Sequence, residues 1–371
     1  MSPWSAAVLG DAIGAIETPV LLLDLDAFDR NLKRMADALS GRGMRLRAHA
    51  KSHKCPDIAL RQVAMGAVGI CCQKVSEAAV FVAAGIKDVL VTNQIASLAK
   101  AHRLAALAHK ARMGVLVDHA QQVIWLQQAA GAAGVSLDVY VEVNVGANRC
   151  GVEPGEEAVA VALLVDKNKP LRFAGLQCYQ GAAQHMREPA QRKAAIAQAS
   201  EWARQTRDAI VAKGLTCERI TGAGTGTFWL ERDSGVFNEI QAGSYIFLDR
   251  DYSDNMSGPE DCLFEHALFI QTTVMSRTIE NKAIVDAGLK ASSVDSGMPS
   301  VWKRPDLKFM KASDEHGVLA MDAQAKLDLG DVLWLVPGHC DPTVNLYDEL
   351  IGVREGRVES IWPISARGAL L

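Results

Sequence analysis

Short apolar runs alternate with longer amphipathic segments along the first 250 residues of the chain. Runs rich in β-branched residues are typical of buried strands, whereas a hydrophobic period of about 3.6 residues is typical of helices. The predicted strands are residues 20–26, 45–50, 67–72, 88–93, 113–118, 138–144, 173–179, 219–224 and 239–247. The predicted helices include residues 26–39, 74–84, 97–110, 156–167 and 189–213. This alternation predicts repeated βα units with a parallel sheet.

The predicted strands exceed by one the eight strands of a closed (β/α)8 barrel. If residues 45–50 form the first barrel strand, eight strands extend to 239–247, and the run at 20–26 is left over. After about residue 255 the pattern changes to short strands separated by turn residues, which is typical of an all-β domain. We therefore expect an α/β barrel over residues 25–250. A C-terminal all-β domain over 251–371 would include the N-terminal strand of residues 1–24.

Composition narrows the possible partners of this chain. Its 371 residues exceed one typical domain of roughly 100–200 residues, and 49% of them are hydrophobic. The net charge of −4 and the absence of long basic runs argue against nucleic acid as a partner. No charge-free apolar stretch of about 18 residues predicts a membrane span. The N-terminus lacks a basic segment before its apolar residues, and the eight cysteines are scattered. Reduced thiols in a cytoplasmic protein are therefore expected.

A cluster of nitrogen bases, RAHAKSHKCP (47–56), spans the predicted end of the first barrel strand. Because side chains alternate along a strand, Arg47, His49 and Lys51 are expected on one face. Active sites of (β/α)8 barrels lie at the carboxyl ends of the strands. The basic neighbours predict a lowered pKa for the Lys51 amine, and an unprotonated amine is what Schiff-base chemistry requires. The alternative is a solvated basic loop.

Two glycine-containing segments, TGAGTGT (221–227) and QAGSY (241–245), coincide with the last two predicted barrel strands. Glycine lets backbone N–H groups approach an anion closely, and Thr225 and Ser244 could add hydroxyl donors. Phosphate sites after the seventh and eighth strands are common in barrels. With Lys51 on the first strand, this pattern predicts pyridoxal 5'-phosphate (PLP), whose aldehyde would meet the lysine and whose phosphate would meet the glycines. An ordinary tight turn is the alternative.

A His-x-Asp element, VPGHCDPT (336–343), extends from a strongly apolar predicted strand. In an extended backbone, His339 and Asp341 would project to the same side and Cys340 to the other. Imidazole and carboxylate ligands suit Mn²⁺, Mg²⁺ or another divalent ion, and two protein ligands leave positions open for a substrate oxygen. A surface turn is the alternative.

Several motifs occur together between about Thr18 and Gly368. They are HAKSHKCP (49–56), GICCQKVSEA (69–78), NRCGV (148–152), QCYQG (177–181) with QH (184–185), TGAGTGT, QAGSY, VDAGLK (285–290), DEHG (314–317) and HCDPT (339–343). In combination they resemble D-threonine aldolases, and most of all the D-3-hydroxyaspartate aldolase branch. These are alanine-racemase-like, fold type III PLP enzymes related to D-serine dehydratase. The resemblance implies a PLP-binding TIM barrel plus a β domain that carries a metal site.

The resemblance also implies roles for individual residues toward PLP. Lys51 would carry the Schiff base, Arg149 would hydrogen-bond the phenolic oxygen, and Tyr179 would line the ring. Gln241 corresponds to an arginine that contacts the pyridine nitrogen in the racemases, and Gln73 is also expected to contact the cofactor. The residues expected to hold the phosphate are Gly224, Thr225, Gly243, Ser244 and Tyr245.

For the reaction itself, the resemblance implies that His339 and Asp341 bind a divalent metal and that His185 is catalytic, near the substrate hydroxyl. The related D-serine dehydratases use a His-x-Cys pair on zinc. Here Cys340 is adjacent to His339, and the residue two positions after the histidine is Asp341. This difference favours the aldolase branch.

The implied function is a metal-activated carbon–carbon lyase, most simply a homodimer that uses Mn²⁺ or Mg²⁺. It would cleave D-3-hydroxy amino acids, of the D-3-hydroxyaspartate or D-threonine type, to glycine and glyoxylate or acetaldehyde. A dehydratase that releases ammonia, an amino-acid racemase and a non-catalytic PLP carrier are the alternatives. The sequence leaves the β-substituent of the substrate open.

Overall fold

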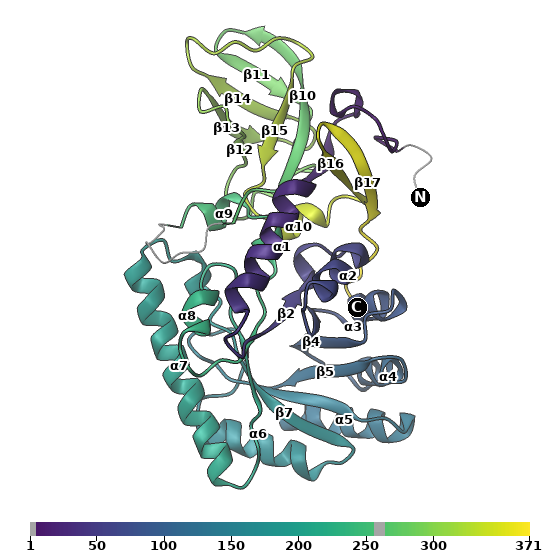
Figure 1. Cartoon of the computed structure of the whole chain (residues 1–371), viewed down its shortest axis with the longest axis vertical. Helices are drawn as coiled ribbons and strands as arrows, with labels where there is room; N and C mark the ends of the chain where they lie inside the picture. The colour runs from purple at the N-terminus through teal and green to yellow at the C-terminus, as the bar shows by residue number, and fades with distance from the viewer. Residues whose placement is uncertain (1–4, 256–263) are drawn as a thin grey trace.

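A closed barrel of eight parallel strands forms the first part of the computed structural model of this protein (Figure 1), which describes residues 5–255 and 264–371. The barrel strands are β2 (Arg45–His49), β3 (Gly69–Cys72), β4 (Asp88–Gln94), β5 (Arg112–Val117), β6 (Leu137–Glu142), β7 (Leu171–Cys178), β8 (Arg219–Gly222) and β9 (Glu239–Ile240). β9 closes the ring by pairing with both β8 and β2. The α/β barrel predicted from the alternating pattern is confirmed.

Helices cover the outside of the barrel (Figure 1). The longer ones are α1 (Leu25–Leu39), α2 (Pro56–Ala64), α3 (Val75–Ala83), α4 (Leu98–Leu107), α5 (Ala120–Ala133), α6 (Glu156–Lys167) and α7 (Pro189–Ala212). The shorter helices and 3₁₀ turns are η1 (Ile13–Ala15), η2 (Ala50–Ser52), η3 (Ala182–His185), α8 (Phe228–Arg232), η4 (Ser244–Ile246), α9 (Arg250–Ser253) and α10 (Cys340–Val344). Apolar side chains of helices and strands, such as Leu104 and Val141, share one buried core.

A separate nine-stranded sheet forms the second part of the molecule. Its strands are β1 (Val20–Asp24), β10 (Leu268–Ile279), β11 (Lys282–Val285), β12 (Ser300–Val301), β13 (Leu307–Ala312), β14 (Gly317–Met321), β15 (Val332–Val336), β16 (Glu349–Arg354) and β17 (Arg357–Pro363). β1 pairs antiparallel with β10 and parallel with β16. The prediction that the spare N-terminal strand joins the β domain is confirmed. Residues 1–4 and 256–263, which the predicted boundaries assign to that domain, lie outside the described residues.

Several predicted strands are shorter in the structure, among them the runs at 20–26 and 239–247. The run at 20–26 stops being a strand at Asp24, because the Asp24 carboxylate accepts the Ala27 N–H at 3.0 Å and thereby caps α1. The predicted strand at 239–247 ends at Ile240. Beyond it the chain packs against the barrel, where a Cβ on Gly243 would lie 2.6 Å from the His49 carbonyl oxygen. The segment then turns into η4 and leaves the sheet.

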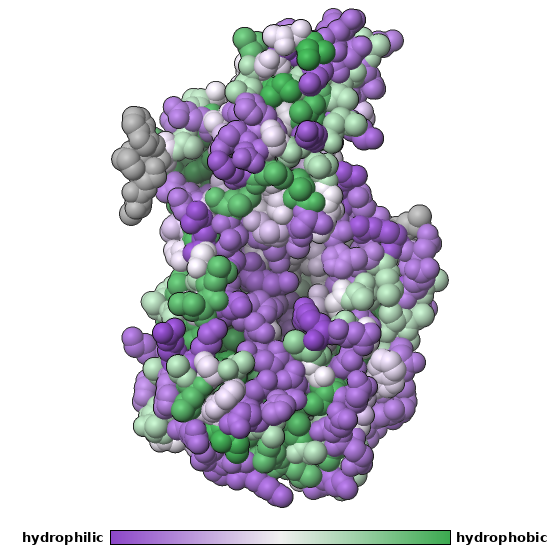
Figure 2. Space-filling view, turned by 180° about the vertical axis from the view of Figure 1, so that it is seen from behind, coloured by the Kyte–Doolittle hydropathy of each residue, from purple (hydrophilic) through white to green (hydrophobic). Residues whose placement is uncertain are grey.

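The carboxyl ends of the barrel strands face the sheet, and the short helices α9 and α10 lie between the two parts (Figure 1). α10 contacts η2, the turn that carries Lys51. Hydrophilic residues gather along the face where the two parts meet (Figure 2). This junction is where the fold brings distant polar segments together.

The sequence predicts reduced cysteines and no membrane-spanning segment. The described cysteines are all free thiols, as expected for reduced cysteines. Within residues 5–255 and 264–371, no helix combines the length and the apolar character needed to cross a membrane.

A buried charged network fills the barrel near the start of β2. Arg47 donates from Nε to Glu239 Oε1 at 3.0 Å and from a terminal nitrogen to Asp88 Oδ1 at 2.6 Å. The Arg47 side chain is 3% exposed and that of Glu239 is fully buried. Removing one partner of a buried pair leaves an uncompensated charge, which is strongly destabilising.

We predict that Arg47→Met lowers the free energy of unfolding by about 3–5 kcal/mol, because it leaves the Glu239 carboxylate buried without its cation. Urea unfolding followed by circular dichroism measures this change. The control is Lys33→Met, which removes the exposed Lys33–Asp37 pair and should change stability by no more than about 0.5 kcal/mol. Equal stability of the two variants would contradict the prediction.

Candidate active site

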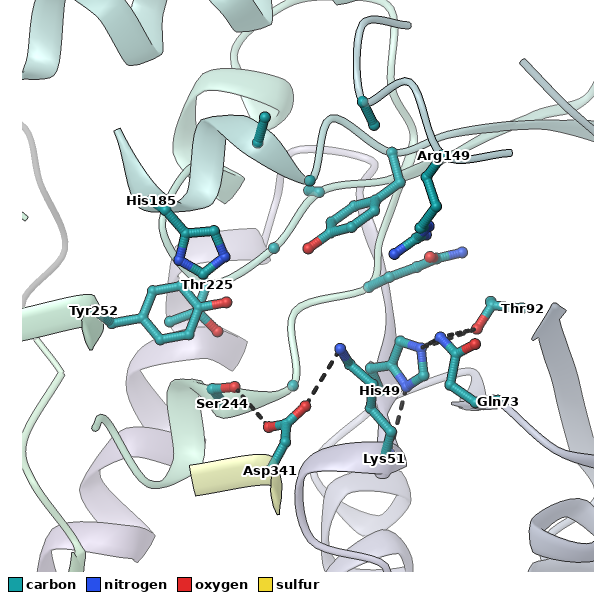
Figure 3. A pocket seen from close by; sticks show the side chains of 18 of the residues that line it. His49, Lys51, Gln73, Thr92, Arg149, His185, Thr225, Ser244, Tyr252 and Asp341 are labelled. Atoms are coloured by element: carbon teal, nitrogen blue, oxygen red, sulfur yellow. Dashed lines mark hydrogen bonds and ion pairs between the residues drawn. The ribbon is translucent and has the colours of Figure 1, made fainter. Parts of the chain in front are cut away.

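A cavity of about 380 Å³ opens at the carboxyl ends of the barrel strands, on the side that faces the β domain (Figure 3). This is the end at which (β/α)8 barrels build active sites. The predicted site residues that line it are Lys51, Gln73, Arg149, Tyr179, His185, Gly224, Thr225, Gln241, Gly243, Ser244, His339 and Asp341. The fold therefore brings residues from seven separate motifs, and from both parts of the molecule, to one cavity.

Tyr245 is the predicted site residue whose side chain the structure does not bring to the cavity. It is 1% exposed, it packs against the ring of Phe264, and its hydroxyl accepts a hydrogen bond from Gln62 at 3.2 Å. The η4 turn directs Ser244 to the cavity and the Tyr245 side chain into the hydrophobic core.

Lys51 lies in η2, immediately after β2, rather than within the strand. Its Nζ is 3.3 Å from Oδ2 of Asp341, which belongs to α10 of the β domain. This carboxylate raises the pKa of Lys51, so the predicted lowering of that pKa is wrong. The sequence shows the neighbouring bases but not the acid, which is almost 300 residues away.

The other bases of the lysine cluster do not repel Lys51 as predicted. Arg47 is paired with Glu239 and Asp88, and Lys54 donates to Glu77 at 2.6 Å. Burial lowers the pKa of His49 well below its usual value and that of His53 to about 3, so both imidazoles are neutral. Among the described residues of this cluster, Lys51 is therefore the amine that faces the cavity, where its partner is Asp341 of the β domain.

His49 is held in one orientation beside Lys51. Its Nδ1 accepts the Lys51 backbone N–H at 3.4 Å, and its Nε2 lies 2.9 Å from the hydroxyl of Thr92. Thr92 in turn donates to the Cys72 carbonyl at 3.2 Å, so its oxygen is the acceptor for the Nε2–H of the neutral ring. The side-chain amide of Gln73 donates to the same Thr92 hydroxyl at 3.4 Å. Gln73 thus supports His49 at the edge of the cavity.

The glycine-rich segments form an anion cradle on one side of the cavity. The Thr225 hydroxyl is buried without a hydrogen-bond partner although Thr225 lines the cavity. A Cβ on Gly224 would overlap the side chain of Gln184, so the backbone there lies close against its surroundings. An orphaned hydroxyl beside closely packed glycine backbone fits a phosphate oxygen, which would supply the missing acceptor.

A chain of buried hydrogen bonds holds the backbone of this cradle in place. Gln184 accepts the Gly226 N–H at 2.9 Å and donates to the hydroxyl of Thr227 at 2.8 Å. Thr227 donates to Oε1 of Glu231 at 2.8 Å, and the other carboxyl oxygen of Glu231 has no partner. Burial raises the pKa of Glu231 to about 7. The cradle therefore depends on a buried carboxyl group that ionises near neutral pH.

The floor of the cavity is neutral. Gln177 and Gln241 exchange side-chain amide hydrogen bonds at 3.0 and 2.7 Å, and Gln241 also donates to the Thr221 hydroxyl at 2.9 Å. Both glutamines are almost fully buried. At the position where the racemases are expected to have an arginine, this chain thus presents an uncharged amide pair.

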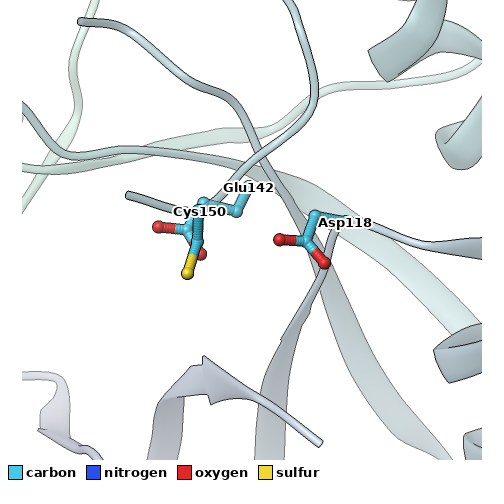
Figure 4. A group of neighbouring side chains, drawn as sticks. All are labelled: Asp118, Glu142 and Cys150. Carbon is cyan, nitrogen blue, oxygen red and sulfur yellow. The ribbon is translucent and has the colours of Figure 1, made fainter. Parts of the chain in front are cut away.

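Arg149 enters the cavity from the loop after β6, and its guanidinium lies over the Tyr179 ring at 5.8 Å. The same loop carries Cys150, whose sulfur forms a group with carboxylate oxygens of Asp118 and Glu142 (Figure 4). These atoms are of the kinds that can hold a metal ion, and they lie within 4.8 Å of one another. Asp118 accepts the Gly151 N–H at 3.0 Å, and Glu142 accepts a hydrogen bond from Gln94. Both carboxylates thus already accept hydrogen bonds from the protein, and we interpret the group as an anchor for the loop that carries Arg149.

His339 and Asp341 line the cavity together, but not by the predicted geometry. The chain is not extended here, because α10 begins at Cys340. His339 Nδ1 lies 2.8 Å from Oδ2 of Asp295, and Asp341 accepts from the Ser244 hydroxyl at 3.3 Å. Burial opposes ionisation of Asp341, but Lys51 and His339 outweigh it and lower its pKa to about 2. A carboxylate and an imidazole whose Nδ1 is held by a second carboxylate fit a divalent cation.

The short helix η3 carries His185, which also lines the cavity. Its Nδ1 lies 2.6 Å from Oδ2 of Asp251, and its ring stacks near Tyr252, with the ring centroids 6.5 Å apart (Figure 3). Sequence reasoning missed Thr92, Asp251, Tyr252 and Asp295. None of them lies in a motif with a recognisable spacing, and each meets its partner across more than 40 residues.

Comparison with known proteins assigns the chain to a family. A family model described as the N-terminal domain of alanine racemase matches residues 23–251, and one described as a putative serine dehydratase domain matches residues 267–353. The 3-hydroxy-D-aspartate aldolase of Paracoccus denitrificans (strain Pd 1222) is 48% identical over 359 residues, covering 95% of this chain and 92% of that protein. The crystal structure of D-threonine aldolase from Filomicrobium marinum is 51% identical with a TM-score of 0.97, covering 99% and 100% of the two chains. The chain belongs to this aldolase family.

The dehydratases are more distant relatives of this aldolase family member. D-threo-3-hydroxyaspartate dehydratase of Delftia sp. (strain HT23) is 27% identical, covering 90% of this chain and 93% of that protein. The resemblance expected from the motifs is confirmed, and the aldolase relatives are carbon–carbon lyases, the enzyme class that the motifs imply. The alanine-racemase-like family also implies PLP, which the orphaned Thr225 hydroxyl and the Lys51 amine fit.

The buried carboxyl of Glu231 predicts a pH-dependent stability. Its pKa is about 7 in the folded protein, against roughly 4.3 in an unfolded chain, so the stability of the protonated form is lost as the pH rises through 7. Glu231→Gln cannot ionise. We predict that its free energy of unfolding, relative to the original protein, rises by about 1–3 kcal/mol between pH 4.5 and pH 8.

Urea unfolding at both pH values measures this difference. Glu218→Gln, an exposed glutamate on the same barrel, is the control and should show no such rise. A pH-independent difference between Glu231→Gln and the original protein would mean that Glu231 is already ionised at acidic pH.

Proposed function

We propose that the protein is a PLP-dependent, divalent-metal-activated aldolase that cleaves D-3-hydroxy amino acids to glycine and an aldehyde. The observation that carries this proposal is one cavity that holds a lysine amine, an anion cradle and a His–Asp pair, with Lys51 3.3 Å from Asp341. The aldolase family of the chain supports the same reaction. D-3-Hydroxyaspartate, giving glyoxylate, and D-threonine, giving acetaldehyde, are the substrate types that we propose.

PLP, when bound, supplies an electron sink for the breaking of a bond at the substrate Cα. We assign the Lys51 amine to its aldehyde and the cradle of Gly224, Thr225, Gly243 and Ser244 to its phosphate. Arg149 would donate to its phenolic oxygen, and Tyr179 would flank the ring. The neutral pair of Gln177 and Gln241 would face the pyridine edge. This lining is consistent with a flat, anionic, aldehyde-bearing cofactor.

A divalent ion, Mn²⁺ or Mg²⁺, would supply Lewis acidity toward the hydroxyl oxygen of the substrate. We assign it to Nε2 of His339 and a carboxylate oxygen of Asp341. The contact between His339 Nδ1 and Asp295 supports this, because ligating imidazoles usually donate their second N–H to a carboxylate or carbonyl. A pair of one imidazole nitrogen and one carboxylate oxygen, without a thiolate, favours these cations over a thiolate-preferring ion.

The side chains around the cavity then decide which proton moves. We propose that His185 accepts the proton of the substrate hydroxyl while the Cα–Cβ bond breaks, which yields the aldehyde and leaves the electron pair on Cα. Protonation of Cα gives glycine. If a base instead removed the Cα proton and the hydroxyl left, the products would be a 2-oxo acid and ammonia. The first course is supported by the presence of His185 in the lining of the same cavity as Lys51 and Asp341.

The dehydratase is the second candidate, because the family model that matches residues 267–353 is described as a putative serine dehydratase domain. Against it, the relative named as a dehydratase is 27% identical and the aldolase is 48% identical. The aspartate at position 341, two residues after His339, also differs from the His-x-Cys pair expected of the D-serine dehydratases.

We further propose that the protein is a homodimer located in the cytoplasm and that its partners are small molecules.

We predict that incubation with D-3-hydroxyaspartate or D-threonine, PLP and Mn²⁺ releases glycine and the corresponding aldehyde in equal amounts, with no ammonia. Chromatography of the products and an ammonia assay make the distinction. Release of a 2-oxo acid with ammonia would establish the dehydratase instead. Lys51→Ala should abolish turnover, and borohydride treatment of the original holoprotein should label Lys51.

We predict that His339→Ala and Asp341→Asn each weaken metal activation by about 100-fold or more, whereas both variants still bind PLP, as absorbance spectra would report. Asp295→Asn should weaken metal affinity by about 10–100-fold, because it releases the second ring nitrogen of His339. His102→Ala, an exposed histidine on α4, is the matched control and should respond to Mn²⁺ like the original protein. Full activity of the first two variants in EDTA would exclude this metal site.

A further inference from the structure

We propose that Asp251 is a positioning residue that keeps the proton of His185 on Nδ1 and turns its Nε2 to the cavity as the proton acceptor, with Arg187 holding Asp251 in place. This inference rests on the proposed function in one respect, the role of His185 in the reaction. The orientation of the ring is a separate structural statement that can be tested by itself.

The contact between the two side chains defines the tautomer. His185 Nδ1 lies 2.6 Å from Oδ2 of Asp251, and an ionised carboxylate can only accept, so Nδ1 carries the proton. In a neutral imidazole the other nitrogen then has the lone pair. Asp251 is 4% exposed and lies behind the ring, whereas His185 itself lines the cavity. Nε2, on the other side of the ring from Nδ1, is therefore the nitrogen that can take a substrate proton.

Asp251 is itself fixed as an anion. Oδ1 accepts from Arg187 at 2.5 Å, which leaves Oδ2 for His185. Burial opposes ionisation of Asp251, but the hydrogen bonds from His185 and Arg187 outweigh it and lower its pKa. Each carboxyl oxygen thus has one cationic or N–H partner, and the carboxylate cannot rotate without losing one of them.

The same segment ties the imidazole to the metal-binding side of the cavity. The Asp251 backbone N–H donates to the Gly338 carbonyl at 3.1 Å, and Gly338 immediately precedes His339. Arg187 also donates to the Asp251 carbonyl at 2.5 Å and to Asn255 at 2.7 Å. α9 therefore holds the proposed base at a set position relative to the proposed metal ligand, although the two come from different parts of the molecule.

A purely structural ion pair would explain Arg187 and Asp251 but not the direction of the His185 ring. The backbone contacts of Arg187 and Asp251 do not involve the Asp251 carboxylate, so Asp251→Asn should keep the fold of α9. An asparagine can turn its NH₂ group toward His185. Nδ1 would then become the acceptor, and the ring proton would move to Nε2, where it blocks proton uptake.

The first test is a ¹⁵N spectrum of histidine-labelled holoprotein, with the His185 signals assigned from their loss in His185→Ala. When the ring is neutral, we expect the original protein to show protonated Nδ1 and unprotonated Nε2, and Asp251→Asn to show the reverse. Glu188→Gln, the same chemical change at an exposed neighbour, should leave the spectrum unchanged. An Nε2-protonated ring in the original protein would overturn the inference, whatever reaction the enzyme catalyses.

The second test is kinetic and uses D-threonine with PLP and Mn²⁺. Asp251→Asn should lower kcat on the order of 100-fold with KM changed by no more than about 2-fold, because general-base catalysis contributes on this scale. Asp251→Glu should recover part of the loss, and Glu188→Gln should match the original protein. In a His185→Ala background, Asp251→Asn should have no further effect. An equal loss in both backgrounds would show that Asp251 acts independently of His185.

The two tests separate the inference from the proposed function. If the original protein turned over no D-3-hydroxy amino acid, the proposed function would fail, and the spectrum would still decide how Asp251 orients the ring. If turnover were normal in Asp251→Asn, the positioning role would fail while the aldolase reaction stood.

Discussion

The contact between Lys51 and Asp341 is the interaction on which the cavity depends. The amine belongs to the barrel and the carboxylate to the β domain, and they meet at 3.3 Å only because α10 packs against η2. The barrel alone would present Lys51 and the anion cradle without the His–Asp pair. The β domain alone would present His339 and Asp341 without the amine and the anion cradle. The candidate site is therefore a property of the junction between the two parts.

Burial sorts the bases of the first barrel strand into different states. Arg47 is charged and paired in the interior, and Lys54 is paired with Glu77. His49 is neutral because burial, reinforced by the nearby charge of Lys51, lowers its pKa well below the usual value. One amine, Lys51, remains directed to the cavity. A cluster that looks uniformly cationic in the sequence thus presents one amine to the cavity, while its other bases are neutral or paired in the interior. The buried carboxylate of Asp251 is likewise paired, through its contacts with His185 and Arg187.

Different regions of the cavity have different electrostatic characters, which suits a cofactor with distinct ends. The cradle offers a hydroxyl and glycine backbone, the floor offers amides, and the β-domain side offers a carboxylate and an imidazole. Supporting residues outside the lining hold each region in place: Glu231 through Thr227, Thr221 through Gln241, Asp295 through His339, and Asp251 through His185. The chain's relationship to the aldolases and, more distantly, to the dehydratases is consistent with one scaffold whose reaction depends on the groups around it.

The sequence by itself determined the barrel, the extra strand and most of the cavity lining, because apolar periodicity records burial and short motifs record local backbone geometry. The spare strand at residues 20–26 and the glycine segments at 221–227 are examples. Only the tertiary structure decided that Tyr245 turns into the core, that α10 replaces an extended His-x-Asp segment, and that Asp341 raises the pKa of Lys51. The sequence patterns did not point to Asp251 or Asp295 either. Both make their contacts with residues far along the chain, and no local pattern specifies which distant side chains folding will bring within 3 Å.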